Sequence, residues 1–96
     1  MATPQMTLHT VRVLLELRRG PRYGLEIVRM LGLKSGTIYP VLTRLEEAGW
    51  IQGEWEIIDP HDEGRPPRRY YKITNAGAER MWTALAEAGL QERTTS

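Results

Sequence analysis

The residues best suited to chemistry on a partner molecule lie in the segment SGTIYPVLTRLEEAGW, residues 35–50. In a helix, successive residues are turned by about 100°, which would separate an apolar side of this segment from a polar one. The polar side offers hydroxyls, an aromatic ring and bare backbone, from Ser35, Gly36, Thr37, Tyr39 and Pro40. Hydroxyls bond to phosphates and base edges, and free amides at a helix start attract phosphate. This face suits a nucleic-acid groove; the alternative is that Tyr39 only covers an edge of the core.

A second candidate surface is the basic segment GRPPRR, residues 64–69, whose two prolines stiffen the backbone. Arginines on a stiff projection can reach a phosphate backbone or an A·T-rich minor groove. The basic residues that we expect to contact DNA, here and on the helix, are Lys34, Arg44, Arg65, Arg68 and Arg69. Asp62 and Glu63 lie next to the segment and would repel phosphates, so the alternative is that these arginines are only solvated.

The composition excludes several other classes of chemistry. The 96 residues include no cysteine, and neither His9 nor His61 has a carboxylate spaced for a metal site or a catalytic triad. We therefore expect no enzyme, no metal and no cofactor. The net charge is only +1, yet residues 1–48 hold seven bases against four acids. No apolar run would span a membrane and MATPQM is unlike a signal peptide, so we expect a cytoplasmic protein.

Helical spacing of apolar residues predicts three helices in the first half of the chain. The first begins near Leu8 and ends before Gly20, and the second covers residues 23–31 and is closed by Gly32. The third begins with Ser35 as its N-cap and ends near Gly49. Its apolar side consists of Ile38, Val41, Leu42 and Leu45. Three helices joined by short turns are typical of a helix-turn-helix protein.

The second half of the chain predicts a β-hairpin and one more helix. The alternation in IQGEWEII indicates a half-buried strand, with Ile51, Trp55 and Ile57 on its inner side, and RRYYKIT indicates a second strand. A turn-rich loop, DPHDEGRPP, joins them. Thr74 then caps a helix from residue 75 to about 90 with an apolar stripe, including Met81, Trp82 and Leu85. We expect a mainly α fold with a small β-hairpin, in the order ααα-ββ-α.

Four motifs, YGLEIV, SGTIYPVLTRLEEAGWI, GRPPRRYYKIT and NAG, resemble in this order those of the PadR family of winged-helix transcriptional regulators, over about residues 23–81. The resemblance implies a winged helix-turn-helix DNA-binding domain in residues 1–74 and a C-terminal dimerisation helix and tail in residues 75–96, as in short members. It implies a homodimeric repressor that binds double-stranded DNA at an inverted repeat. The helix beginning at Ser35 would enter the major groove, and the hairpin would be the wing. Met81, Trp82 and Leu85 would pair across the dimer.

Two alternatives stay open at this point. In some relatives a flat aromatic ligand binds between subunits, so a small aromatic effector near Trp82 is one reading, and plain interface core is the other. A winged helix that mainly binds another protein, with weak or non-specific DNA binding, is the second alternative, and the near-neutral charge favours it. A steep loss of DNA affinity with rising salt would separate a DNA-binding protein from such a module.

Overall fold

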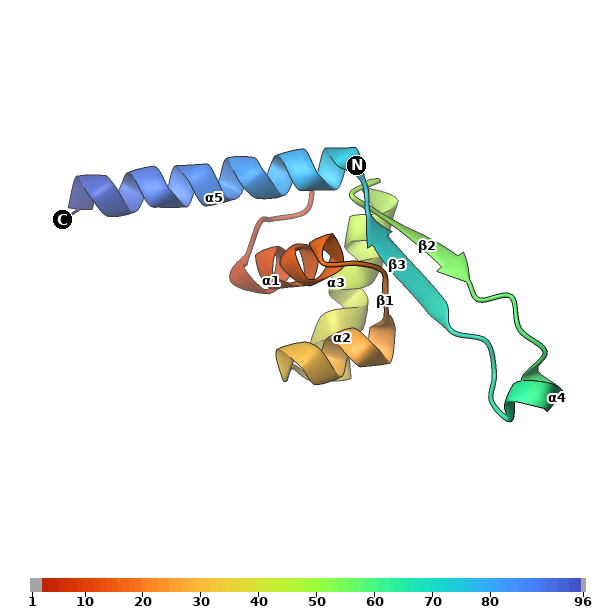
Figure 1. Cartoon of the computed structure of the whole chain (residues 1–96). Helices are drawn as coiled ribbons and strands as arrows, with labels where there is room; N and C mark the ends of the chain where they lie inside the picture. The colour runs from red at the N-terminus through yellow and green to blue at the C-terminus, as the bar shows by residue number, and fades with distance from the viewer. Residues whose placement is uncertain (1–2, 96) are drawn as a thin grey trace.

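Five helices and three strands follow one another in this computed structural model, which describes residues 3–95 and the side chains of residues 3–89. They are α1 (Leu8–Arg18), β1 (Arg22–Tyr23), α2 (Gly24–Leu31), α3 (Ser35–Glu47), β2 (Ile51–Trp55), α4 (Pro60–Glu63), β3 (Arg69–Ile73) and α5 (Asn75–Thr95). In Figure 1, α1, α2 and α3 form the body, the β2 and β3 hairpin projects on one side and α5 on the other. The predicted mainly helical winged-helix fold is confirmed.

The core lies where α1, α2 and α3 meet the base of the hairpin. The apolar side of α3 is buried as its spacing predicts, with Ile38 and Leu45 fully covered. It packs with apolar side chains of the other elements: Val13, Leu14, Leu17, Ile27, Trp50, Ile51 and Met81. Each fully buried side chain of this size contributes about 1.5–3 kcal/mol through removal of apolar surface from water. This burial fixes which side of α3 faces outward.

Helix α3 begins differently from the prediction. Its N-cap is Lys34, not Ser35, because Lys34 has extended backbone (φ −72°, ψ 148°) and its carbonyl already accepts the amides of Thr37 at 2.9 Å and Ile38 at 3.1 Å. Ser35 is therefore the first residue of the helix, and no side chain caps this end. The first amides of such a helix have no carbonyl partner within it. The turn before α3 contains Gly32, whose φ of 66° is left-handed and favours glycine.

The sheet has three antiparallel strands in the order β1-β3-β2, where the sequence predicts two. The additional strand, β1, is only two residues long, too short to show a pattern, and pairs Arg22 with Tyr71 and Tyr23 with Tyr70. Strands β2 and β3 pair from Ile51 with Ile73 out to Trp55 with Arg69. The predicted loop at the hairpin tip contains the short helix α4.

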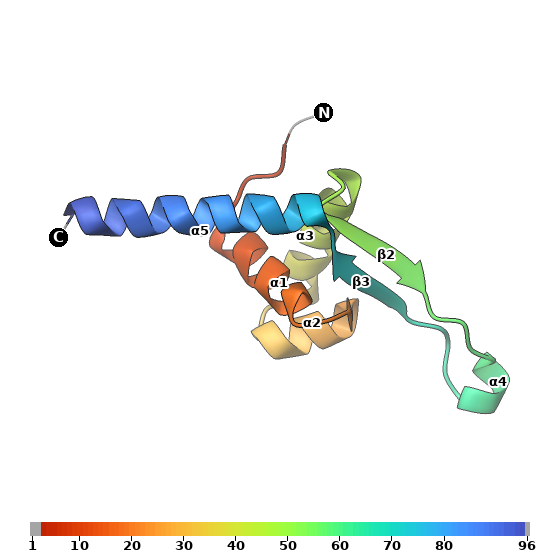
Figure 2. The ribbon, with the colours of Figure 1, turned by 45° about the horizontal axis from the view of Figure 1, so that its top comes forward.

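The strand predicted over residues 51–58 ends at Trp55 in the structure, and the expectation that its inner side is covered is wrong at Trp55 and Ile57. Ile51 is buried, but Trp55 is 63% exposed and Ile57 is 101% exposed. The alternation of residue types is present, yet the hairpin extends past the body, as Figures 1 and 2 both show, so no other layer covers its outer half. An alternating pattern indicates a strand, and only the surrounding structure decides whether its apolar side is covered.

Helix α5 begins against the body and then extends away from it (Figure 2). Thr74 caps it as predicted, since its hydroxyl accepts the amide of Gly77 at 3.1 Å and donates to the carbonyl of Gly49 at 2.7 Å. Met81 is fully buried in the core of its own chain. The body of its own chain therefore already covers this side chain, which leaves Met81 no exposed surface for the predicted pairing across a dimer. Within the described residues, no helix is both long and apolar enough to cross a membrane.

Candidate nucleic-acid interface

The outward side of α3 presents most of the predicted contact residues to solvent. Ser35, Gly36, Tyr39 and Pro40 are exposed and Thr37 is half-buried. Lys34 and Arg44 are also exposed. Pro40 lies inside the helix, yet α3 continues without a break from Ser35 to Glu47. From residue 34 to residue 45 the chain contains no acid, so this surface has a positive charge at both ends and bare backbone at Gly36, where an added Cβ would meet nothing within 4 Å.

Tyr39 is both a surface residue and a packing residue. Its side chain is 42% exposed, and its ring lies over the backbone of Gly24, the first residue of α2. A Cβ built on Gly24 would lie 2.5 Å from Cε1 of that ring. The ring thus covers part of α2, as one alternative expects, and it also keeps exposed surface, so a DNA contact by Tyr39 stays a prediction. Gly24 is a site residue that the sequence pattern does not reveal.

The start of α1 lies beside the outward side of α3. An open hollow between them is lined by residues of both helices: Thr7, Leu8, His9, Gly36, Thr37, Pro40, Val41 and Arg44. His9 is exposed there, although nothing in its sequence surroundings marks it as part of the site. The hollow extends the candidate surface from α3 onto α1.

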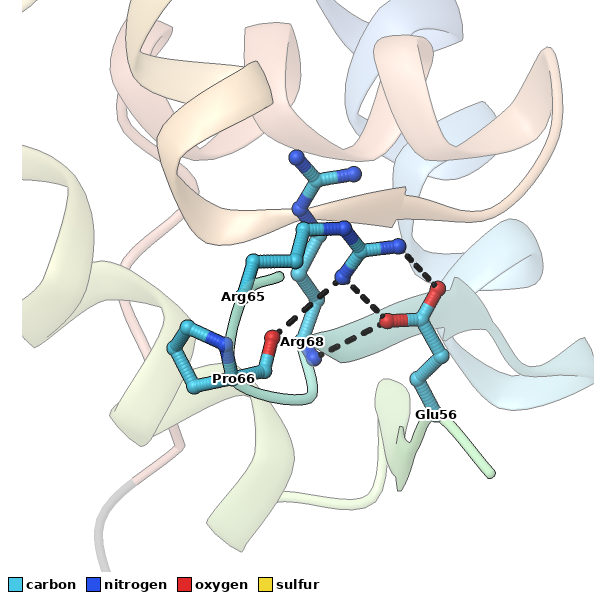
Figure 3. A network of polar contacts seen from close by, with 4 residues as sticks. All are labelled: Glu56, Arg65, Pro66 and Arg68. Atoms are coloured by element: carbon cyan, nitrogen blue, oxygen red, sulfur yellow. Dashed lines mark hydrogen bonds and ion pairs between the residues drawn. The ribbon is translucent and has the colours of Figure 1, made fainter. Parts of the chain in front are cut away.

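Arg65, the first of the three wing arginines, forms an ion pair within the wing. Both terminal nitrogens of Arg65 donate to the Glu56 carboxylate, Nη1 to Oε1 at 2.6 Å and Nη2 to Oε2 at 3.1 Å (Figure 3). The same carboxylate accepts the backbone amide of Arg68 at 3.3 Å. The hydrogen bond from Arg65 lowers the pKa of the Glu56 carboxyl below its ordinary value, against a smaller opposing effect of burial. Glu56 thus ties the two sides of the wing together.

Arg68 is held in another way. Its guanidinium carbon lies 4.3 Å from the centre of the Tyr23 ring, and Tyr23 and Tyr70 meet edge to face with ring centres 5.5 Å apart. Figure 3 shows that the Arg68 side chain points away from the Glu56 carboxylate, which contacts only its amide. Arg68 therefore lies over an aromatic ring and makes no ion pair with the described part of the chain.

Arg69 lies at the base of the wing and joins it to α3. Its Nη2 donates to Oε2 of Glu46 at 2.6 Å, and the same oxygen accepts the amide of Gly53 at 3.2 Å. Gly53 leaves room for this arrangement, since a Cβ there would lie 2.7 Å from Nε of Arg69. The sequence predicts a DNA contact for Arg69, whereas the structure places it in a link between wing and helix.

The sequence and the fold are matched in known proteins. The family model described as the transcriptional regulator PadR-like family matches residues 13–83, which is most of the chain. The chain belongs to the PadR-like family of transcriptional regulators. The sequence resemblance, which covers about residues 23–81, is confirmed, and this family is one of regulators and not of enzymes.

Solved structures share this fold. A PadR family transcriptional regulator from Eggerthella lenta shares 28% identity over 90% of this chain and 76% of its own length, with a TM-score of 0.75. A PadR family regulator from Clostridium difficile shares 24% identity over 92% and 94%, with a TM-score of 0.79. Bacillus subtilis PadR in complex with operator DNA shares 24% identity over 82% and 48%, with a TM-score of 0.70. No protein of curated function matches the sequence.

In this PadR-like regulator the remaining predicted interface residues lie near α1. Trp82 is 49% exposed, with the Arg18 guanidinium carbon 4.8 Å from its ring centre, and Leu85 is half-buried against the core. Leu15, on α1, is also exposed. Trp82 therefore leaves apolar surface uncovered on α5, and Leu15 leaves apolar surface uncovered on α1.

A second hollow lies between the N-terminal residues and the ends of α3 and α5. It is lined by Thr3, Pro4, Gln5, Thr7, Thr10, Arg44, Glu47, Ala48, Trp50 and Arg80. Arg80 stacks on Trp50, with its guanidinium carbon 5.4 Å from the ring centre. Trp82 does not line this hollow. Among the residues that the structure describes, no group of three or more His, Asp or Glu side chains is placed to hold a metal ion.

Proposed function

We propose that this PadR-like regulator binds double-stranded DNA through the outward side of α3 and the wing. The observation that carries the proposal is the N-terminal half of α3, which is free of acids and exposes Ser35, Gly36 and Tyr39 between Lys34 and Arg44. Such a helix fits the major groove, with its first amides and basic ends on phosphates and its hydroxyls on base edges. The wing lies alongside and can reach the flanking backbone.

We propose further that the regulator acts as a homodimeric repressor on an inverted repeat. The support is the exposed apolar surface of Trp82 and Leu15, which a second copy of the chain would cover. A two-fold symmetric dimer places its two recognition helices on half-sites about one helical turn apart or a multiple of it. Residues 1–74 would then form the DNA-binding part, and the exposed side of α5 the dimerisation part. The regulator would act in the cytoplasm, and a small aromatic effector would bind near Trp82 where the copies meet.

One observation favours the alternative, a module that binds another protein. Two of the three wing arginines are neutralised by Glu56 and Glu46, while Trp55 is largely exposed on the same wing. A surface of low net charge with an exposed aromatic residue is typical of protein interfaces. This alternative predicts weak DNA binding.

Selection from a pool of randomised duplexes at near-physiological salt tests these proposals together. An enriched inverted repeat supports a dimeric, sequence-specific regulator, and a single enriched half-site contradicts the dimer but not the DNA-binding role. Retention without enrichment indicates attraction to phosphates alone. If the pure protein retains no duplex, the alternative replaces the proposal. Whether the bound site lowers or raises transcription of a reporter in a cell-free system decides between repressor and activator.

A further inference from the structure

Given the proposed DNA binding, we infer that the wing presents Arg68, and neither Arg65 nor Arg69, to the phosphate backbone, and that Tyr23 is the residue that positions it. The three wing arginines are equivalent in the sequence, where each is a basic residue within one short segment. In the structure each guanidinium uses a different part of its surface. The contacts of each arginine determine which of its N–H groups remain available for a phosphate.

Arg65 already uses both of its terminal nitrogens within the wing. A guanidinium binds a carboxylate and a phosphate with the same in-plane N–H groups. Arg65 uses Nη1 and Nη2 on Glu56, and Nη1 also donates to the carbonyl of Pro66 at 3.3 Å. A phosphate would have to displace the carboxylate and leave a charged Glu56 beside the DNA. The Glu56 backbone amide also donates to the carbonyl of Arg68 at 2.8 Å, so the pair belongs to the closure of the wing.

Arg69, at the base of the wing, is also bound by a carboxylate of its own chain. Its Nη2 is 2.6 Å from Glu46, and its guanidinium carbon lies within 6 Å of the ring centres of Trp55 (5.5 Å) and Tyr71 (5.9 Å). Glu46 lies at the C-terminal end of α3, away from the exposed N-terminal half that would enter the groove. The role of Arg69 is to join the wing to α3.

Arg68 differs because its guanidinium lies over the Tyr23 ring, 4.3 Å from the ring centre, and donates no hydrogen bond to an acceptor in the described part of the chain. Its N–H groups therefore remain available for a phosphate. Glu56 attracts the charge of Arg68 through space, but in the described structure it forms no ion pair with that side chain. A guanidinium that already lies over an aromatic ring is restricted before it binds, so less side-chain entropy is lost on binding.

Tyr23 also couples Arg68 to the recognition helix. It directly precedes Gly24, on whose backbone the ring of Tyr39 rests. The path Arg68, Tyr23, Gly24, Tyr39 therefore joins the wing to the outward side of α3 through direct contacts and one peptide bond. Tyr23 would in this way fix the spacing between a backbone contact from the wing and the groove contacts of α3.

The salt dependence of DNA binding tests the inference, because each phosphate contact contributes about 0.9 to the slope of log affinity against log salt concentration. The variants are Arg68→Ala and the double replacement Glu56→Gln with Arg65→Gln, which removes both charges of the internal pair and leaves the net charge unchanged. Affinity for a labelled duplex from the selection is measured across a salt series. Circular dichroism verifies that each variant is folded.

We expect Arg68→Ala to reduce the slope by about one and to weaken binding roughly eightfold at 0.1 M salt. The double variant should keep the wild-type slope. Tyr23→Leu should keep the slope, because the charge remains, but weaken binding severalfold, and Tyr23→Phe, which keeps the ring, should restore it. The assignment would be overturned if the slope fell in the double variant and not in Arg68→Ala. It would also be overturned if the slope fell in both variants or in neither. Failure of the wild-type protein to bind any duplex would instead overturn the proposed function itself.

Discussion

The ring of Tyr39 on α3 occupies the space above Gly24 where any other residue would carry a side chain: a Cβ on Gly24 would lie 2.5 Å from Cε1 and 2.9 Å from Cζ of the ring. The contact joins the start of α2 to the outward side of α3. An atom that close forces a movement, and the end of an exposed tyrosine can move more easily than two helix backbones can. The exposed ring of Tyr39 can keep this position only because Gly24 has no side chain.

Replacement Gly24→Ala should therefore change DNA binding more than stability. Alanine favours the helical conformation by up to about 1 kcal/mol over glycine, which offsets part of the strain, and Tyr39 should swing into solvent. We expect a free energy of unfolding within about 1 kcal/mol of wild type and a loss of sequence preference like that of Tyr39→Ala. Denaturant unfolding and competition between the selected and a scrambled duplex measure the two effects. A large stability loss, or unchanged sequence preference, would contradict this account of the contact.

Gly36 gives a complementary prediction, since an added Cβ there meets nothing within 4 Å of the protein. Gly36→Ala should raise the free energy of unfolding by up to about 1 kcal/mol through helix propensity. If the bare backbone is needed for close approach to DNA, the same methyl group should weaken binding at least severalfold. Thermal unfolding together with a binding titration checks both, and tighter binding by the stabilised variant would show that DNA does not approach this position closely.

The elements that carry the interface could be predicted because their signals are local. The spacing of Ile38, Val41, Leu42 and Leu45 determines which side of α3 is buried, and so which side is exposed. The Thr74 cap and the left-handed Gly32 follow from local backbone preferences in the same way. Strand β1 cannot be predicted in this way, because two residues have no periodicity and its pairing with β3 joins positions nearly fifty residues apart.

What the sequence could not reveal is how charged and apolar residues are partnered across the fold. The acids closest in sequence to the wing arginines are Asp62 and Glu63. The carboxylates that in fact bind Arg65 and Arg69 are Glu56, on the opposite side of the wing, and Glu46, on α3. Met81 reads as part of an exposed stripe, yet it is buried because α5 starts against the body. Such partners depend on tertiary packing, which spacing along the chain does not encode.

Gly77, in the motif NAG, should be the glycine least tolerant of substitution. A Cβ on Gly77 would overlap the backbone oxygen of Trp50, which also accepts the amide of Thr74 at 3.0 Å. Because a backbone group cannot swing aside, Gly77→Ala should destabilise the fold by roughly 1–3 kcal/mol despite its better helix propensity. Gly89→Ala, in the same helix with open space around the added methyl group, is the matched control and should not destabilise. Equal unfolding midpoints of the two variants would contradict the packing of α5 on the turn before β2.

The ion pair between Glu56 and Arg65 should make the free energy of unfolding depend on pH. The hydrogen bond from Arg65 lowers the pKa of Glu56 in the folded state from its ordinary 4.5, so its contribution is complete above pH 4.5 and is lost as the pH falls through the folded value. Glu56→Gln cannot be protonated in this range. The difference in unfolding free energy between wild type and Glu56→Gln should therefore shrink as the solution is acidified below pH 4.5, as denaturant titrations at several pH values can measure. A difference that is constant with pH would show that the pair does not stabilise the folded wing.

The proposed dimer can be tested by replacing Trp82. This tryptophan is exposed, so its replacement should not disturb the core. Leu85 is a poorer probe, because it packs against the core of its own chain and its replacement would also destabilise the monomer. Trp82→Ser should convert dimers to monomers in light scattering, since a tryptophan at the centre of an interface commonly contributes 2 kcal/mol or more, about 30-fold in the dissociation constant. Trp55→Ser is the matched control: Trp55 is at least as exposed, but it lies on the wing and should leave the dimer intact. A wild-type protein that is already monomeric at micromolar concentration, or dissociation caused by Trp55→Ser and not by Trp82→Ser, would remove the basis for a dimer formed through α5.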